Sequence, residues 1–239
     1  MDFSFRPRQP FGGKPHQGEK IMMKISHKLT LLLLTIAPLF AKAQVNVGLK
    51  GGLTRAWEFY NLDLPEDAKI TVTQMHISGM VYYDLKSFVR IGVEPGFVQR
   101  GAACEPGWQP AFEGDTRLFL DCVELPVMIS GHLPVDEGRL ELFAKAGYGL
   151  TMVVRGRNEF VLIGTDTSDD ITRIPLGRGS RLNRWDTGFY GGAGIGARIG
   201  PGNLIFETSA YAGLIDADRF NTSKNRSVNF SLGYILILN

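Results

Sequence analysis

The sequence lacks features that mark several common classes of protein. Its 239 residues include four histidines and two cysteines, and neither a metal-ligand spacing nor a Ser-His-Asp or G-x-S-x-G pattern occurs. The long apolar faces of amphipathic helices are missing, and no apolar run after the N-terminal region is long enough for a membrane-spanning helix. We therefore expect no metal, no cofactor and no enzymatic activity, and a fold that is not built from helices.

Positive charge is also scarce once the N-terminal region is set aside. The formal net charge is +2, but residues 1–43 carry seven Lys or Arg against two acidic residues, which leaves 44–239 with a net charge of −3. Proteins that bind nucleic acid usually present a strongly basic surface. We therefore expect no nucleic-acid partner.

The N-terminal region has the composition of a secretory signal peptide. Two lysines precede a run of twelve mostly apolar residues at 29–40, and an A-x-A cleavage sequence follows at 41–43. A run of this length that contains proline is too short to span a ~30 Å hydrocarbon core, which argues against a membrane anchor. The expected division of the chain is an upstream extension at 1–22, a signal peptide at 23–43 cleaved between Ala43 and Gln44, and an exported domain at 44–239.

From residue 44 onward, apolar residues alternate with small or polar residues, which is typical of β-strands with two different faces. At the start of the domain, Val45, Val47 and Leu49 fall on one face, whereas Lys50 and Thr54 fall on the other. The same alternation recurs in seven further segments, near 74–84, 89–97, 123–129, 140–151, 186–199, 204–214 and 227–238. These strands are longer than the ~5–6 residues usual in a β-sandwich and are long enough to cross a membrane at a tilt.

The connections between these segments alternate between short turns and long polar loops. Outer membrane barrels show this pattern, with tight turns in the periplasm and longer loops outside. The charged residues share a face with the glycines, which suits a narrow polar lumen, and the aliphatic face suits lipid. We predict an all-β fold, an eight-stranded antiparallel up-and-down transmembrane β-barrel. The alternatives are an antiparallel sandwich with one wet face and a soluble exported β-barrel that binds a small ligand.

The segment 191–200, GGAGIGARIG, contains the G-x-G-x-x-A form of the dinucleotide-binding fingerprint. That fingerprint requires a turn from a strand into a helix, whereas Gly200, Pro201 and Gly202 here form a turn that forbids a helix. We expect the alternate glycines to lie on the lumen face of a strand, where they leave room inside a narrow barrel.

The residues expected to face the lumen include both acidic and basic side chains: Arg90, Glu94, Glu124, Glu141, Lys145, Asp186, Arg198 and Glu207. An eight-stranded barrel is only just wide enough for side chains to fill it, and buried charges need partners. We interpret this set as a charge-paired plug. The alternatives are a proton relay or an ion path, and an enzyme site at the rim that would use His76 with Asp84.

Cys104 and Cys122 flank the expected outer loop at 101–116. If the hairpin turns near residue 113, the two residues lie opposite each other, and the periplasm is oxidising. A disulfide between them is therefore our hypothesis, and two free thiols are the alternative.

The expected outer loops contain groups suited to binding a partner. The loop 155–183 with the residue that follows it is the most basic outer segment, and phosphorylated lipopolysaccharide is a natural counterpart for the arginines there, Arg155, Arg157, Arg173, Arg178, Arg181 and Arg184. Trp108 and Phe112 in the loop 101–116 either contact a partner or rest on lipid headgroups. Other aromatic residues near strand ends are placed as in interface girdles: Trp57, Phe59, Tyr60, Tyr82, Tyr83, Phe88, Trp185 and Tyr234.

Five segments resemble hallmark strands of one known family: VGLKGGLT (47–54), VEPGFVQRG (93–101), FLDCVELPVMIS (119–130), FAKAGYGL (143–150) and DTGFYGGAGIGARI (186–199). In this order they resemble the PorT-like outer membrane β-barrel family of Bacteroidota, and the resemblance covers 44–239. It implies an eight-stranded barrel in the outer membrane without a defined activity, and one branch of that family is linked to protein secretion and gliding. The chain departs from many outer membrane barrels at its end, because Asn239 stands where an aromatic residue is common.

We therefore expect a non-enzymatic protein of the bacterial outer membrane with a structural or surface-interaction role through its outer loops. The expected partners are outer membrane lipid, lipopolysaccharide and a protein at the outer loops, and we expect a monomer. A component of a protein secretion and gliding apparatus is the alternative function.

Overall fold

The computed structural model describes residues 44–60, 69–104, 114–162, 172–176, 180, 182–218 and 223–238. The expected upstream extension and signal peptide lie outside these residues. The strands are β1 (Val45–Tyr60), β2 (Lys69–Ile70), β3 (Val72–Lys86), β4 (Val89–Val93), β5 (Gly96–Cys104), β6 (Gly114–Val135), β7 (Leu140–Leu162), β8 (Thr172–Ile174), β9 (Trp185–Ile199), β10 (Gly202–Asp218) and β11 (Ser223–Leu238). A short 3₁₀ turn, η3 (Asp136–Gly138), joins β6 to β7.

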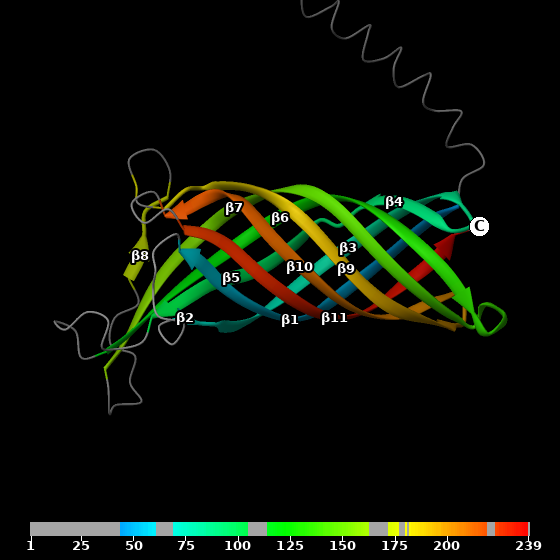
Figure 1. The fold of residues 1–239 in the computed structure, drawn as a ribbon, viewed down its shortest axis with the longest axis horizontal. Helices are drawn as coiled ribbons and strands as arrows, with labels where there is room; N and C mark the ends of the chain where they lie inside the picture. Colours follow the sequence, from blue (N-terminus) through cyan, green and yellow to red (C-terminus); the bar gives the residue numbers. More distant parts are fainter. Residues whose placement is uncertain are drawn as a thin grey trace, which may run out of the picture. The chain divides into compact units, whose positions relative to one another are not determined.

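The strands form one antiparallel sheet that closes on itself (Figure 1). The first and last long strands pair with each other, since β1 lies between β3 and β11. From β11 the ring continues through β10, β9, β7 and β6. β4 and β5 together occupy the place between β6 and β3, so that eight strands surround the lumen. The predicted up-and-down barrel is thereby confirmed.

The path shared by β4 and β5 is interrupted at Glu94 and Pro95, because proline has no N–H to donate to a neighbouring strand. Two backbone hydrogen bonds hold the sheet together across the interruption. The amide of Gly79 donates to the carbonyl of Pro95 (2.8 Å), and the amide of Glu94 donates to the carbonyl of Pro126 (3.1 Å). The interruption leaves the Glu94 side chain buried inside the barrel.

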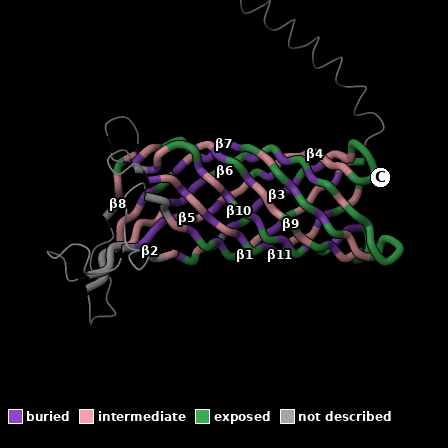
Figure 2. The backbone as a smooth tube through the Cα atoms, viewed as in Figure 1, coloured by how far each residue is buried: buried purple, intermediate pink, exposed green. Residues whose placement is uncertain are grey.

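Buried residues alternate with more exposed ones along the spanning strands (Figure 2). Leu49, Ile77 and Leu232 on the wall are 66%, 58% and 59% exposed. The lumen face of β11 is instead polar and buried: Ser223, Asn225, Ser227, Asn229 and Ser231. A soluble barrel has the reverse arrangement, so this apolar wall is that of a barrel in contact with lipid. The soluble and sandwich alternatives do not fit it.

The two ends of the barrel differ in their connections (Figure 1). One end carries tight turns at 87–88, at η3 and at 200–201, and we call it the short-turn end. The opposite end, the long-loop end, carries the longer connections and the short strands β2 and β8, which pair with β5 and β7. Within the described residues, no helix is long and apolar enough to cross a membrane.

The hairpin of β5 and β6 fills the interior near the long-loop end. Residues 100–103 and 120–122 are buried consecutively, so both faces of the hairpin are covered there. One apolar cluster consists of Val98, Leu120, Cys122, Val153 and Leu182, and another of Ala56, Val72 and Ala103. The lumen near this end is therefore packed with side chains.

The glycine-rich segment forms the middle of β9. The strand continues to Ile199 and turns at Gly200, whose φ is +61°, so no helix follows it and the nucleotide-binding pattern has no structural counterpart. Gly192 and Gly194 face the lumen, where a Cβ atom on Gly194 would overlap the ring of Phe143 and the carbonyl of Phe206. The expected role of these glycines, which is to leave room inside the barrel, is confirmed.

Candidate functional site

Four buried side chains of opposite charge meet in the lumen, and we call them the central cluster: Lys50 of β1, Glu94 between β4 and β5, Lys145 of β7 and Glu207 of β10. The Nζ atom of Lys50 lies 2.8 Å from Glu94 Oε2 and 2.7 Å from Glu207 Oε1. The Nζ atom of Lys145 lies 2.5 Å from Glu94 Oε1 and 2.6 Å from Glu207 Oε2. The formal charges cancel and each charge has two partners, which is the condition under which ions are tolerated in an interior.

A second charged group, the short-turn cluster, lies nearer the short-turn end. Arg90 donates from Nε to Asp84 Oδ1 (2.8 Å), and its two terminal nitrogens lie 3.1 and 3.2 Å from the carboxylate oxygens of Glu141. The Nδ1 atom of His132 lies 2.8 Å from Glu141 Oε1. The planar guanidinium therefore joins two carboxylates that come from different strands.

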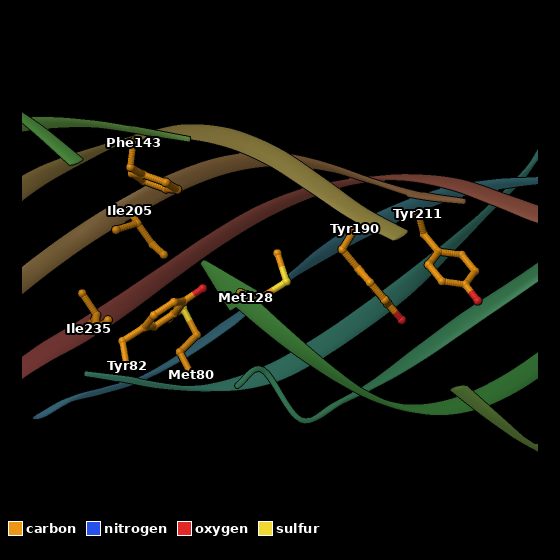
Figure 3. Packing of buried hydrophobic residues seen from close by; sticks show 8 residues of the cluster. All are labelled: Met80, Tyr82, Met128, Phe143, Tyr190, Ile205, Tyr211 and Ile235. Atoms are coloured by element: carbon orange, nitrogen blue, oxygen red, sulfur yellow. The ribbon is translucent and has the colours of Figure 1, made fainter. Parts of the chain in front are cut away.

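The space between these two clusters is small. A cavity of about 30 Å³ lies among Met80, Tyr82, Phe143, Ile205 and Ile235, with members of both clusters in its wall. This volume holds about one water molecule. Figure 3 shows these five side chains directed toward one another, with Met128, Tyr190 and Tyr211 further along the lumen. The lumen therefore offers no open passage in this region.

A third charged group is centred on Arg100 of β5, which is 1% exposed. Its Nη2 atom lies 2.5 Å from Glu124 Oε2, and its guanidinium carbon lies 3.9 Å from the centre of the Tyr211 ring. The hydroxyl of Tyr190 also donates to Glu124 (3.0 Å). The cation is thus held by a carboxylate and by an aromatic face.

The predicted lumen charges fall into separate groups rather than one network. Glu94, Lys145 and Glu207 meet in the central cluster, Arg90 and Glu141 meet in the short-turn cluster, and Glu124 binds Arg100. Asp186 is buried apart from them, where it accepts hydrogen bonds from Asn225 and from two backbone amides. The placement of Arg198 in the network is wrong, because this residue lies exposed at the end of β9.

Sequence reasoning missed several members of these groups. Lys50 was assigned to the correct face but not to the charged set, and Asp84 was considered only as a partner of His76. Arg100 continues the alternation of Arg90 and Glu94 beyond the interruption at Pro95, so the alternation itself was the signal for it. His132 lies on β6, beyond the expected strand near 123–129, because β6 extends to Val135.

The pairing of His76 with Asp84 does not occur. His76 is 6% exposed, and its two ring nitrogens lie 3.0 Å from Thr54 Oγ1 and 2.8 Å from Ser231 Oγ. Asp84 is engaged by Arg90 in the short-turn cluster. His76 therefore lies within the packed lumen rather than at a rim.

The hairpin does not bring the two cysteines together. Cys104 pairs with Thr116, and Cys122 pairs with Val98, so the cysteines are six positions apart along the β5–β6 ladder. Cys122 is a free, buried thiol. The expectation that the two residues lie opposite each other is wrong, and with it the basis for the disulfide.

Three arginines of the expected basic loop line one open pocket at the long-loop end. Arg155, Arg173 and Arg184 are exposed, and the pocket has a volume of about 530 Å³. Arg157 is instead bound to Asp121, with Nη2 and Oδ1 3.4 Å apart. Arg178, Arg181, Trp108 and Phe112 lie outside the described residues.

Two residues of the expected aromatic girdles are exposed: Phe88 (54%) in the turn at 87–88 and Trp185 (57%) at the start of β9. The prediction that Tyr82 belongs to an interface girdle is wrong, because this side chain points into the lumen, where its hydroxyl donates to Glu94. The side chains of Phe59 and Tyr60 lie outside the described residues. In the part of the chain that the structure describes, no group of three or more His, Cys, Asp or Glu residues could hold a metal ion.

Comparison with known proteins identifies one family. A family model described as "Outer membrane protein beta-barrel domain" matches residues 38–219. No curated protein sequence matches the chain.

Several solved structures are similar to this chain. Neisserial surface protein A is 12% identical, with 82% of this chain and 99% of that chain covered and a TM-score of 0.47. OprG from Pseudomonas aeruginosa is 8% identical (80% and 95% covered, TM-score 0.41), and the protease OmpT from Escherichia coli is 14% identical (82% and 97% covered, TM-score 0.41). At these identities the similarity concerns the fold alone.

Proposed function

Because the chain belongs to the outer membrane protein beta-barrel domain family, we propose that it is a closed, non-enzymatic outer membrane barrel that acts through the surface of its long-loop end. One observation carries this proposal. Among the described residues, paired charges and packed side chains fill the lumen from the short-turn cluster to Arg100, so the accessible surfaces are the apolar wall and the two ends.

The charged clusters support a closed lumen. For an ion to pass, Lys50 and Lys145 would have to leave both glutamates of the central cluster at once. Separating buried ions from their partners costs several kcal/mol for each ion, on the order of 3–5 kcal/mol when one partner is removed. A steady pore is therefore disfavoured in this arrangement.

A role without catalysis is supported by the position of the titratable groups. A catalytic acid or base must reach its substrate within hydrogen-bond distance. His76, Glu94 and Glu207 are all less than 7% exposed and are bound to other side chains of the barrel. These groups are therefore covered by side chains of the barrel itself.

The assignment to a more specific family and to an exported protein rests on the sequence. We propose that the chain is a PorT-like barrel of Bacteroidota, exported by the signal peptide at 23–43, on the five segments that resemble that family. In this proposal the short-turn end faces the periplasm. The outer leaflet with its lipopolysaccharide then surrounds the long-loop end of a monomer.

The closed lumen is tested by conductance across a planar lipid bilayer that contains the purified barrel. We expect no steady conductance above that of the protein-free bilayer, whereas a stable open level would overturn the proposal. Affinity purification from the native membrane addresses the alternative function. A stoichiometric protein partner at the periplasmic end would favour a secretion apparatus over a role at the cell surface.

A further inference from the structure

A set of cations without carboxylate partners lies at the long-loop end. Arg155 of β7, Arg173 of β8 and Arg184 before β9 line the same pocket. Among the described residues, none of the three forms an ion pair, in contrast to Arg157, which binds Asp121. Three guanidinium groups around one pocket repel one another unless an anion lies between them.

The backbone holds these arginines in place. β8 pairs with β7 through Gly156 and Ile174, next to Arg155 and Arg173. The carbonyl of Arg184 accepts a hydrogen bond of 2.8 Å from the amide of Val153. The backbone at each of the three arginines is part of the sheet or hydrogen-bonded to it. Little backbone entropy is therefore lost when a ligand binds there.

The pocket is also lined by apolar side chains. Val154, Ile174 and Leu176 belong to its lining, and Val154 is 41% exposed. A free inorganic anion gains nothing from these side chains, because its own surface is polar. A ligand that carries an anionic group and an apolar part matches both features.

The pocket lies beside the apolar wall of the barrel. Trp185, which follows Arg184 directly, is 57% exposed on the wall. Tryptophan on a lipid-facing wall is typical of the headgroup level, and Trp185 is the direct neighbour of Arg184 in the pocket wall.

We infer that Arg155, Arg173 and Arg184 form a binding site for the phosphorylated headgroup of an outer-leaflet lipid. Guanidinium groups bind phosphate oxygens in a bidentate manner, and the apolar side chains of the lining contact the lipid beside the phosphate. The inference rests on the proposed function in one respect, that the long-loop end faces the outer leaflet, and it names the partner of that end.

The test measures binding of purified bisphosphorylated lipid A to the full barrel folded in detergent micelles. The variant replaces Arg155, Arg173 and Arg184 with Gln, and we expect its affinity to fall about tenfold or more, since each exposed ion pair contributes about twofold to fivefold. The matched control removes three exposed cations of the short-turn end, Lys86→Gln, Arg139→Gln and Arg198→Gln, and should bind as the wild type does.

Two further probes identify the source of the phosphate. Lipid A without its phosphates should bind equally to the wild type and the triple variant. Inorganic phosphate that displaces lipid A at comparable concentrations would show a free-phosphate site and overturn the inference. Unchanged lipid A binding by the triple variant, or an equal loss in the control, would also overturn it.

Folding of each variant is checked by its mobility in SDS without heating. If the triple variant does not fold, the single variants Arg155→Gln, Arg173→Gln and Arg184→Gln replace it, each with an expected loss of about twofold to fivefold. A conducting barrel would refute the proposed closed function and leave this site in place. Binding that does not depend on the arginines would refute the site alone.

Discussion

At the scale of single residues, each lysine of the central cluster binds both glutamates, so the loss of one member unbalances the others. In Glu207→Gln, Lys50 and Lys145 share the single carboxylate of Glu94. We expect the free energy of unfolding to fall by about 3–5 kcal/mol, because a buried charge loses its partner. Unfolding by urea in lipid vesicles, followed by tryptophan fluorescence, measures this change.

A double variant distinguishes the cost of an unbalanced charge from the cost of altering the side chains themselves. Lys145→Met with Glu207→Gln leaves the neutral pair of Lys50 and Glu94. It should be less destabilised than the sum of the two single variants, because the four residues form one network. Arg198→Gln is the control, with an expected change within about 0.5 kcal/mol. A cost for Glu207→Gln no larger than that of Arg198→Gln would refute the cluster.

At the scale of one strand, β9 offers two glycines with opposite surroundings. A Cβ atom on Gly194 would overlap Phe143 and the backbone of β10, whereas a Cβ atom on Gly191 would meet nothing within 4 Å. We expect Gly194→Ala to destabilise the barrel by about 1–3 kcal/mol through overpacking. Gly191→Ala should be neutral or more stable by up to about 1 kcal/mol, since it restricts the unfolded chain.

The comparison of these two alanine variants in the same urea experiment tests the assignment of faces along β9. Equal effects at both positions would mean that the glycines are not set apart by lumen packing. A larger effect at Gly191 would reverse the faces of the strand. Both variants change one methyl group in one strand, so a difference between them reports the surroundings rather than the strand propensity of alanine.

The hairpin of β5 and β6 shows what local sequence leaves open. Its pairs, such as Cys104 with Thr116 and Val98 with Cys122, are centred on residue 110, whereas we expected a turn near residue 113. When the centre of a hairpin moves by three residues along the sequence, the residue opposite any given position changes by six. Register in a hairpin is set by its turn, and the connection between Cys104 and Gly114 is longer than the short turns whose sequence specifies a register.

At the scale of the whole molecule, the sequence predicted which face a residue occupies better than which residues meet. Alternation alone placed Glu94, Lys145 and Glu207 in the lumen. It did not pair Lys50 with Glu207, 157 residues away, because such contacts depend on strand tilt and stagger around the closed ring. Arg198 follows the same alternation as the lumen residues. It nevertheless lies near the end of β9, where the barrel no longer encloses side chains.

Closure of the ring makes a further prediction about the whole barrel. β1 and β11 pair from Val45 with Leu238 to Tyr60 with Ser223, which leaves the ring without a free edge. Detergent must then break the whole ring before the chain unfolds, so we expect the unheated protein to migrate differently in SDS from the boiled protein. Carbonate washing should not release it from the membrane fraction, because its wall is apolar.

A variant that lacks residues 223–239 is the control for this experiment. Without β11 the ring has two free edges, and the difference between unheated and boiled samples should disappear. If the full chain shows no difference and carbonate releases it, the apolar faces would have to form an internal core instead of a wall. That result would contradict the arrangement in which Leu49, Ile77 and Leu232 point away from the lumen.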